Sequence, residues 1–273
     1  MVGHEERWKS SERQYILTDS TFTKGELTQD KLPLSQATGK RVQPRWSRER
    51  LQNEASTLNF ISTTTDIPVP KCLGLFEENG LLYLRTERAT GVPLDELGSD
   101  IAVAHVSECL QSSVLPQLRQ LRHHTTGSVN ATLPLFPPSR ITYRDKRPIW
   151  FRKTAPNNDF VFCHNDLGQH NIFVDPDTFA ITAIIDWEFA GYFTPEFECP
   201  LWLRPYNKQG EDHLQTDHLI KFLDDTGKSP KVADTDTFIL ITGRLRLRYA
   251  VAHGRGASVL ARRRFRDARR EGR

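Results

Sequence analysis

The sequence has few of the features that mark several classes of protein. It holds four cysteines among 273 residues, widely spaced and without a C-x-x-C pair. This spacing excludes a zinc knuckle and a disulfide-stapled scaffold, and it fits a reducing compartment. No apolar run reaches about 18 residues, so no transmembrane helix is expected. The charged N-terminus lacks the apolar stretch of a secretory signal, and we therefore predict a cytoplasmic protein without a membrane partner.

Charge is distributed unevenly along the chain. Hydrophobic residues make up 37% and aromatic residues 10%, which is enough to build a folded core. The net charge is +3, but residues 244–273 carry 11 Arg and two acidic residues, so the rest of the chain is at −6. A basic tail suits nucleic acid or an anionic surface. No nucleic-acid module accompanies it, so a nucleic-acid partner is not favoured and a solvated tail is the simpler interpretation.

Residues 1–90 show the pattern of a small β-rich lobe with one helix. Residues 15–24 favour a strand or a hairpin arm, because Thr and aromatic side chains are frequent there. Residues 47–62 carry apolar side chains at helical spacing, and Ser47 is placed to cap this helix. The sequence thus predicts strand, long loop and helix in that order.

A hairpin closes this first part of the chain. Asn79-Gly80 predicts a tight turn between strands at 71–76 and 81–87, since both residue types tolerate positive φ. The connector at 88–97 contains Gly91 and Pro93, which interrupt regular structure. We place the boundary to a second lobe, residues 91–243, in this connector.

The second part is predicted to be mainly helical. Residues 101–123 have one apolar face, and Pro116 should kink or split that helix. Weaker helical patterns follow at 211–224 and 234–251. The Arg-rich residues 244–273 form the tail and are expected to be dispensable for the fold.

The strongest chemical signal lies between short apolar strands at 160–163, 172–175 and 181–186. The loop after the first strand holds His164, Asp166 and Asn171 in the spacing H-x-D-x-x-x-x-N, and Asp186 ends the third strand. A loop held by strands can fix side chains precisely enough for catalysis. Aspartates also occur as turn or cap residues, but the joint spacing favours a site.

This layout suits phosphoryl transfer. The reaction needs a carboxylate that takes the proton of the attacking hydroxyl, a role that fits Asp166. It also needs Mg²⁺ held by hard oxygen ligands, which Asn171 and Asp186 supply if a hairpin brings them together. His164 is expected to brace the loop at this catalytic position by hydrogen bonding.

The segment resembles the aminoglycoside phosphotransferase and choline kinase-like family, most of all its fungal members. The motifs are C-H-N-D-L-G-Q-H-N at 163–171 and I-I-D-W-E-F-A-G-Y at 184–192, where D-W-E stands at the D-F-G position of protein kinases. The resemblance implies an α+β, two-lobed protein-kinase-like fold with a small β-rich N-terminal lobe and a larger, mainly helical C-terminal lobe. It also implies ATP and Mg²⁺ as cofactors.

The resemblance extends upstream, through T-D-I-P-V-P at 65–70. It implies that Lys24, on a strand, pairs with Glu54, on the helix 47–62, to position the phosphates of ATP. Lys40 is the alternative lysine. It also implies that the carbonyl of Glu87 and the amide of Ala89 bind the adenine edge.

The sequence departs from the family in its glycines. Kinases cover the phosphates with a glycine-rich hairpin, but Gly3 is the only glycine before Lys24. We therefore expect the cover, and with it the N-terminal lobe, to be truncated. The function predicted is transfer of the γ-phosphate of ATP to a hydroxyl of a small molecule. The alternative is a catalytically weak or inactive kinase-like binding protein.

Overall fold

A computed structural model gives the fold and describes residues 4–204 and 213–224. These described residues belong to one compact unit. The helix predicted at 234–251 and the Arg-rich tail at 244–273 lie outside the described residues. Within the described ranges, no helix has both the length and the apolar composition that crossing a bilayer requires.

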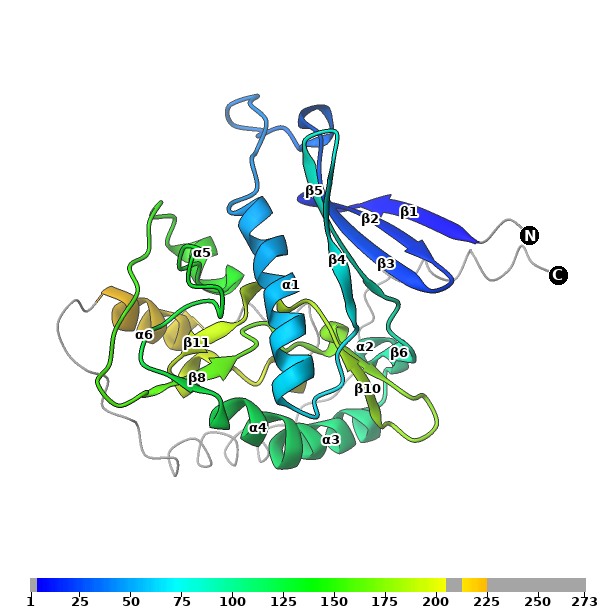
Figure 1. The fold of residues 1–273 in the computed structure, drawn as a ribbon, viewed down its shortest axis with the longest axis vertical. Coiled ribbons are helices and arrows are strands. Elements are labelled where there is room, and N and C mark those ends of the chain that lie inside the picture. Colours follow the sequence, from blue (N-terminus) through cyan, green and yellow to red (C-terminus); the bar gives the residue numbers. More distant parts are fainter. Residues whose placement is uncertain (1–3, 205–212, 225–273) are drawn as a thin grey trace, which may run out of the picture. The chain divides into compact units, whose positions relative to one another are not determined.

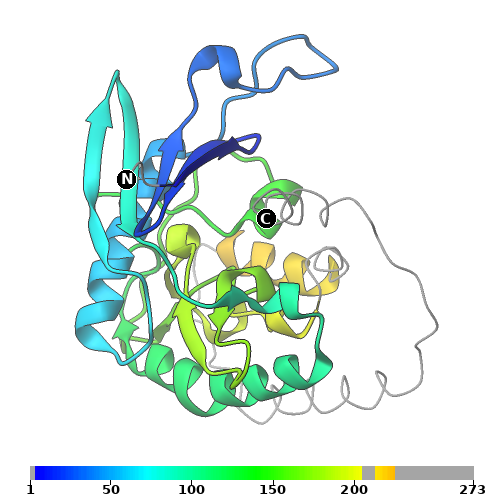
Figure 2. The ribbon, with the colours of Figure 1, turned by 90° about the vertical axis from the view of Figure 1, so that its right-hand side faces the viewer.

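An antiparallel sheet of five strands, which we call the N-terminal sheet, occupies the first part of the chain (Figure 1). The predicted hairpin is present, and its turn residues Asn79 and Gly80 have φ values of 52° and 77°. Its tip points away from helices α3 and α4 (Figure 2). In the order β1-β2-β3-β5-β4, the strands are β1 Glu5–Lys9, β2 Arg13–Thr18, β3 Thr21–Glu26, β5 Leu81–Glu87 and β4 Cys72–Glu78.

The expectation of a truncated N-terminal lobe is wrong, because β1 and β2 form a complete hairpin before the strand that carries Lys24. The turn of this hairpin contains no glycine. The hydroxyl of Ser10 instead accepts hydrogen bonds from the backbone amides of Glu12 and Arg13, at 3.2 and 3.1 Å. A serine that bonds to its own turn stabilises a reversal without positive φ, so glycine is not required there.

Helix α1, Ser47–Thr64, packs against the N-terminal sheet. Its predicted apolar stripe is buried and consists of Leu51, Ala55, Leu58 and Ile61. Ser47 does not cap the helix as expected. Trp46 holds the cap position with φ 50°, and the hydroxyl of Ser47 accepts a hydrogen bond from the guanidinium of Arg13 at 2.6 Å.

The predicted helix at 101–123 is split before its proline. Helix α3, Asp100–Cys109, passes into a π-helical segment, Leu110–Val114, and then into α4, Leu115–Gln120. Pro116 sits in the first turn of α4. Its ring nitrogen carries no hydrogen, so the helical hydrogen bond to the preceding turn is lost and the wider π turn accommodates the break.

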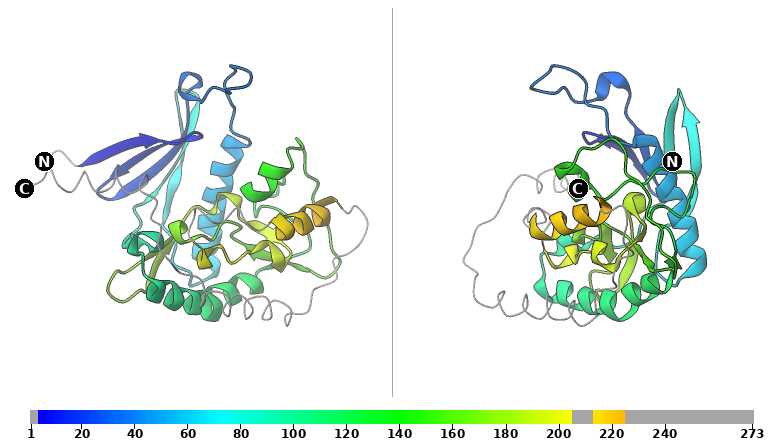
Figure 3. Two further views of the ribbon diagram at one scale, coloured as in Figure 1. Left: turned by 180° about the vertical axis from the view of Figure 1, so that it is seen from behind. Right: turned by 90° about the vertical axis from the view of Figure 1, so that its left-hand side faces the viewer.

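The three strands predicted around the loop are present but belong to two sheets of three strands each. Strand β8, Phe160–Cys163, pairs with β7, Arg122–His123, and with β11, Gly191–Phe193. Helix α4 packs against β8 (Figure 3). The other sheet contains β10 Ile181–Ile184, β9 Ile172–Val174 and β6 Val92–Pro93.

The connector after β5 joins this second small sheet through β6. Gly91 has φ 87°, and a Cβ there would lie 2.4 Å from the carbonyl oxygen of Val174, so this close approach requires glycine. The largest fully buried side chains include Trp187, Trp202, Phe160 and Phe162. The other α-helices of the described residues are α2 Leu94–Leu97, α5 Ser139–Arg144 and α6 His213–Asp224, the last of which confirms the pattern at 211–224.

Candidate active site

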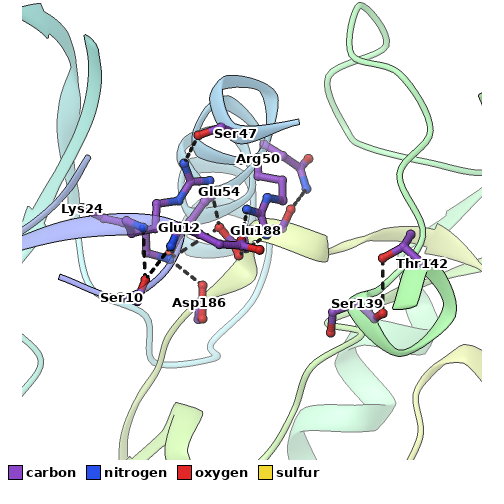
Figure 4. A network of polar contacts seen from close by, with 12 residues as sticks. Ser10, Glu12, Lys24, Ser47, Arg50, Glu54, Ser139, Thr142, Asp186 and Glu188 are labelled. Atoms are coloured by element: carbon purple, nitrogen blue, oxygen red, sulfur yellow. Dashed lines mark hydrogen bonds and ion pairs between the residues drawn. The ribbon is translucent and has the colours of Figure 1, made fainter. Parts of the chain in front are cut away.

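Three elements meet at the side chain of Lys24 (Figure 4). Strand β3 carries Lys24, α1 carries Glu54, and Asp186 follows β10. The Nζ atom of Lys24 lies 2.8 Å from Oε2 of Glu54 and 2.5 Å from Oδ1 of Asp186. The predicted contact between Lys24 and Glu54 is confirmed. The alternative, Lys40, is exposed in the loop before α1.

The acidic residues around Lys24 stabilise its charged form. Burial lowers the pKa of Lys24, but the carboxylates of Asp186, Glu54 and Glu188 more than offset this and raise it above its ordinary value. Burial raises the pKa of Glu54 to about 7, against the opposing effect of Lys24. Burial also disfavours the charge of Asp186, yet Lys24 outweighs it and lowers the pKa of Asp186. Lys24 and Asp186 are therefore both ionised at neutral pH.

His164 braces the loop between β8 and β9, which we call the 164–171 loop. Its fully buried ring places Nε2 2.9 Å from the carbonyl oxygen of Ile185, and Nδ1 accepts the backbone amide of Asp166 at 3.2 Å. The ring also packs on Trp187, with 4.3 Å between centroids. Burial lowers the pKa of His164 to about 4, so the ring is neutral and its Nε2–H is the donor. This geometry fits the bracing role and leaves neither ring nitrogen for proton transfer.

The carboxylate of Asp166 projects from this braced loop. Within the described ranges, no hydrogen bond or ion pair holds its oxygens, although the side chain is half-buried. Burial, followed by the charge of Asp186, raises the pKa of Asp166 to about 7. A carboxylate in this state is able to take up a proton near neutral pH.

Two residues that sequence reasoning missed, Glu198 and Arg140, hold the 164–171 loop by hydrogen bonds to its backbone. The buried carboxylate of Glu198 accepts the backbone amide of His164. The guanidinium of Arg140 donates to the carbonyls of Asn165 and Phe197. Asn165 itself has φ 70°, and its side chain donates to the carbonyl of Phe189 at 2.8 Å. These bonds hold Asn165 in a conformation that is uncommon for residues other than glycine.

Asn171 and Asp186 flank the β9–β10 hairpin, the first directly before β9 and the second two residues after β10. The amide of Ile185 donates to the backbone carbonyl of Asn171 at 3.0 Å. The side-chain nitrogen of Asn171 donates to the carbonyl of Asp166 at 2.8 Å, so its amide oxygen is left as an acceptor. The partly exposed carboxylate of Asp186 is the other hard-oxygen donor at this end of the hairpin, and Mg²⁺ prefers oxygen ligands of this kind.

Glu188 also lies near Lys24, but its carboxylate is paired with two arginines. Oxygens of Glu54, Asp186 and Glu188 lie within 4.8 Å of one another. Glu188, however, pairs with Arg13 at 3.4 Å and with Arg50 at 3.1 Å. Arg50 also pairs with Glu12 in the β1–β2 turn. The oxygens of Glu188 are thus committed to a network that joins this turn to α1.

The two residues expected at the adenine edge lie at the end of β5 and just beyond it. The amide of Glu87 donates to the carbonyl of Lys71 at 2.9 Å, and its carbonyl accepts the hydroxyl of Thr86 at 2.9 Å. Glu87 is exposed and Ala89 is half-buried. For the amide of Ala89 we find no backbone acceptor in the described part of the chain.

Comparison with known proteins gives a family and a fold. The profile of the Phosphotransferase enzyme family matches residues 7–199. No curated protein matches the chain significantly. Among solved structures, the apo form of a thermostable mutant of aminoglycoside phosphotransferase APH(4)-Ia has 14% sequence identity and a TM-score of 0.50, over 92% of this chain and 96% of that one. APH(3'')-Id from Streptomyces rimosus, in complex with ADP and streptomycin, has 17% identity and a TM-score of 0.49, over 83% and 87%.

Proposed function

We propose that this chain, which belongs to the Phosphotransferase enzyme family, transfers the γ-phosphate of ATP to a hydroxyl group of a small molecule. One observation carries this proposal. A buried lysine, paired with a helix glutamate, lies against Asp186, while the 164–171 loop holds the carboxylate of Asp166, which has no partner among the described residues. Phosphoryl transfer relies on positioning and charge more than on covalent chemistry, and this arrangement supplies both.

Each residue has one task in the proposed mechanism. The ammonium of Lys24 binds the phosphates, and Glu54 keeps it in place. Asn171 and Asp186 would hold Mg²⁺, which when bound would neutralise charge on the phosphate oxygens. The acceptor hydroxyl gives its proton to Asp166 while its oxygen bonds to the γ-phosphorus. The bond from that phosphorus to the bridging oxygen breaks, and ADP leaves.

In this proposal, the two lobes have different roles. Residues 1–90 bind the nucleotide, with the Glu87 carbonyl and the Ala89 amide at the adenine edge. Residues 91–243 supply the base and the metal ligands. The alternative, an inactive binding protein, drew support from the missing glycine-rich cover. That support is weaker because a hairpin stands at this position.

The test is turnover of ATP with Mg²⁺ against a panel of metabolites that carry hydroxyl groups. We expect ADP to form faster in the presence of at least one acceptor. Asp166→Asn keeps the shape of the side chain and removes the proton acceptor, so turnover should fall by about 10²–10⁴ while nucleotide affinity is unchanged. Nucleotide binding without turnover on any acceptor would favour the inactive binding protein. Equal turnover in the variant would instead remove Asp166 from the role of base.

A further inference from the structure

Two buried arginines connect the β1–β2 turn to the candidate active site (Figure 4). Arg50 of α1 pairs with Glu12 in the turn and, at 3.1 Å, with Glu188. Arg13, the first residue of β2, pairs with the other oxygen of Glu188 at 3.4 Å and donates to the hydroxyl of Ser47 at 2.6 Å. The turn is thus attached by charge both to α1 and to the segment that follows Asp186.

Helix α1 holds the turn and Lys24 from one face. Arg50 and Glu54 are four residues apart on this helix, so their side chains share a face. Arg50 reaches Glu12, and Glu54 reaches Lys24 at 2.8 Å. Glu188 adds a further link, because its Oε2 lies 3.9 Å from Nζ of Lys24. The position of the turn is therefore fixed relative to the ammonium group.

Glu12 differs from the other acids of this network in its exposure. Its side chain is 46% exposed, whereas that of Arg50 is 7% exposed. Arg50 keeps Glu188 as a partner when the carboxylate of Glu12 is removed, so no buried charge is left uncompensated. Ion pairs open to water add little to stability. Loss of the Glu12 charge should therefore free the turn without unfolding the protein.

We propose that the ion pair between Glu12 and Arg50 holds the β1–β2 turn over the phosphates of the bound nucleotide, in place of the glycine-rich cover that the sequence lacks. The proposal rests on the proposed function, since it takes Lys24 as the phosphate anchor. Glu12 is then a positioning residue, which acts through Arg50 and the turn. A nucleotide should leave faster when this pair is broken. Adenosine has no phosphates for the turn to cover, so its binding should not depend on Glu12.

The experiment compares the Mg²⁺ complex of ADP with adenosine. Dissociation rates of MgADP are measured by stopped-flow displacement, and Kd values of both ligands by calorimetry. Glu12→Gln should raise the dissociation rate and the Kd of MgADP by roughly 2- to 5-fold and leave adenosine unchanged. Glu12→Asp keeps the charge on a shorter side chain and should recover part of the effect.

Glu5→Gln is the matched control. Glu5 is on β1 of the same hairpin, its side chain is 45% exposed, and it pairs with Arg7 at 2.6 Å. It lies opposite Thr18, at the end of the hairpin away from the turn. The control also removes one carboxylate from an arginine pair, so it should release MgADP as the wild type does.

Salt gives a second readout, which a loss of folding would not produce. Added salt screens the pair between Glu12 and Arg50, so the ratio of the Glu12→Gln rate to the wild-type rate should approach 1 between about 0.05 and 0.5 M KCl. Release of MgADP at the wild-type rate by Glu12→Gln, or equal weakening of adenosine and MgADP, would overturn the role of this ion pair and leave the proposed function standing. A wild type that binds no MgADP would instead remove the nucleotide site itself.

Discussion

The side chain of Lys24 places an ammonium group among three carboxylates. Oxygens of Glu54 and Asp186 contact it, and an oxygen of Glu188 lies 3.9 Å away. Removing one partner of a buried ion pair leaves a charge uncompensated. We expect Lys24→Met to lower the free energy of unfolding by about 3–5 kcal/mol, measured by chemical denaturation. Adding Glu54→Gln to this variant should recover part of the loss. Unchanged stability in the single variant would contradict the ion-pair arrangement.

Asp166 should give the reaction a pH dependence of defined sign. Its pKa is raised to about 7, chiefly by burial, and only the deprotonated carboxylate accepts the hydroxyl proton. The initial rate of ADP formation in the presence of an acceptor should therefore rise about tenfold per pH unit below about 7 and level off above it. The residual rate of Asp166→Asn should lack this step. A wild-type profile that stays flat through neutral pH would rule out Asp166 as the base.

The site residues that can be predicted from the sequence lie in one local motif, whereas those that cannot are paired across long sequence separations. Asp166, Asn171 and Asp186 stand out because strand, loop and strand follow one another within one short segment. Arg13 and Arg50 meet Glu188 at separations of 175 and 138 residues, and no local pattern marks such pairs. No sequence pattern marks Glu198 either, since its role is to accept a hydrogen bond from a backbone amide.

At the scale of elements, the 164–171 loop depends on the buried carboxyl of Glu198. Burial raises the pKa of Glu198 to about 7, so between about 4.5 and 7 the folded chain keeps a proton that the unfolded chain has released. The free energy of unfolding therefore falls as pH rises through this window, by up to about 3 kcal/mol from this residue.

Glu198→Gln tests this sign. Glutamine retains an oxygen that accepts the amide of His164 but does not titrate, so the variant should lose less stability than the wild type over the same pH range. The measurement is urea denaturation at a series of pH values. Parallel curves for the two proteins would show that the carboxyl is not buried as the structure has it.

The elements themselves were predictable where the pattern was apolar. Helix α1, the β4–β5 hairpin and the break at Pro116 all follow from local spacing or from a single breaker residue. Strand β1 was missed because it consists of E-E-R-W-K and is almost wholly exposed at the edge of the sheet. An edge strand of this kind carries no apolar alternation, and only its pairing with β2 identifies it.

At the scale of the whole molecule, the described core lies in residues that precede the Arg-rich tail. Residues 262–264 are three consecutive arginines, which are unsuited to burial without partners. We expect deletion of residues 262–273 to leave the melting temperature nearly unchanged, as measured by calorimetry. A large loss would mean that the basic tail docks on the acidic remainder of the chain.

Asn53 limits the order in which the chain can fold during synthesis. Its buried amide donates to the carbonyls of Glu188 and Ala190, which are 135 and 137 residues further along. Contacts of such high sequence separation form late, because the chain between them must first be closed into a loop. The buried face of α1 therefore lacks these two partners until the later residues have left the ribosome. Nascent chains arrested before Asp186 should therefore remain sensitive to protease along α1, and resistance should appear only once Ala190 has emerged.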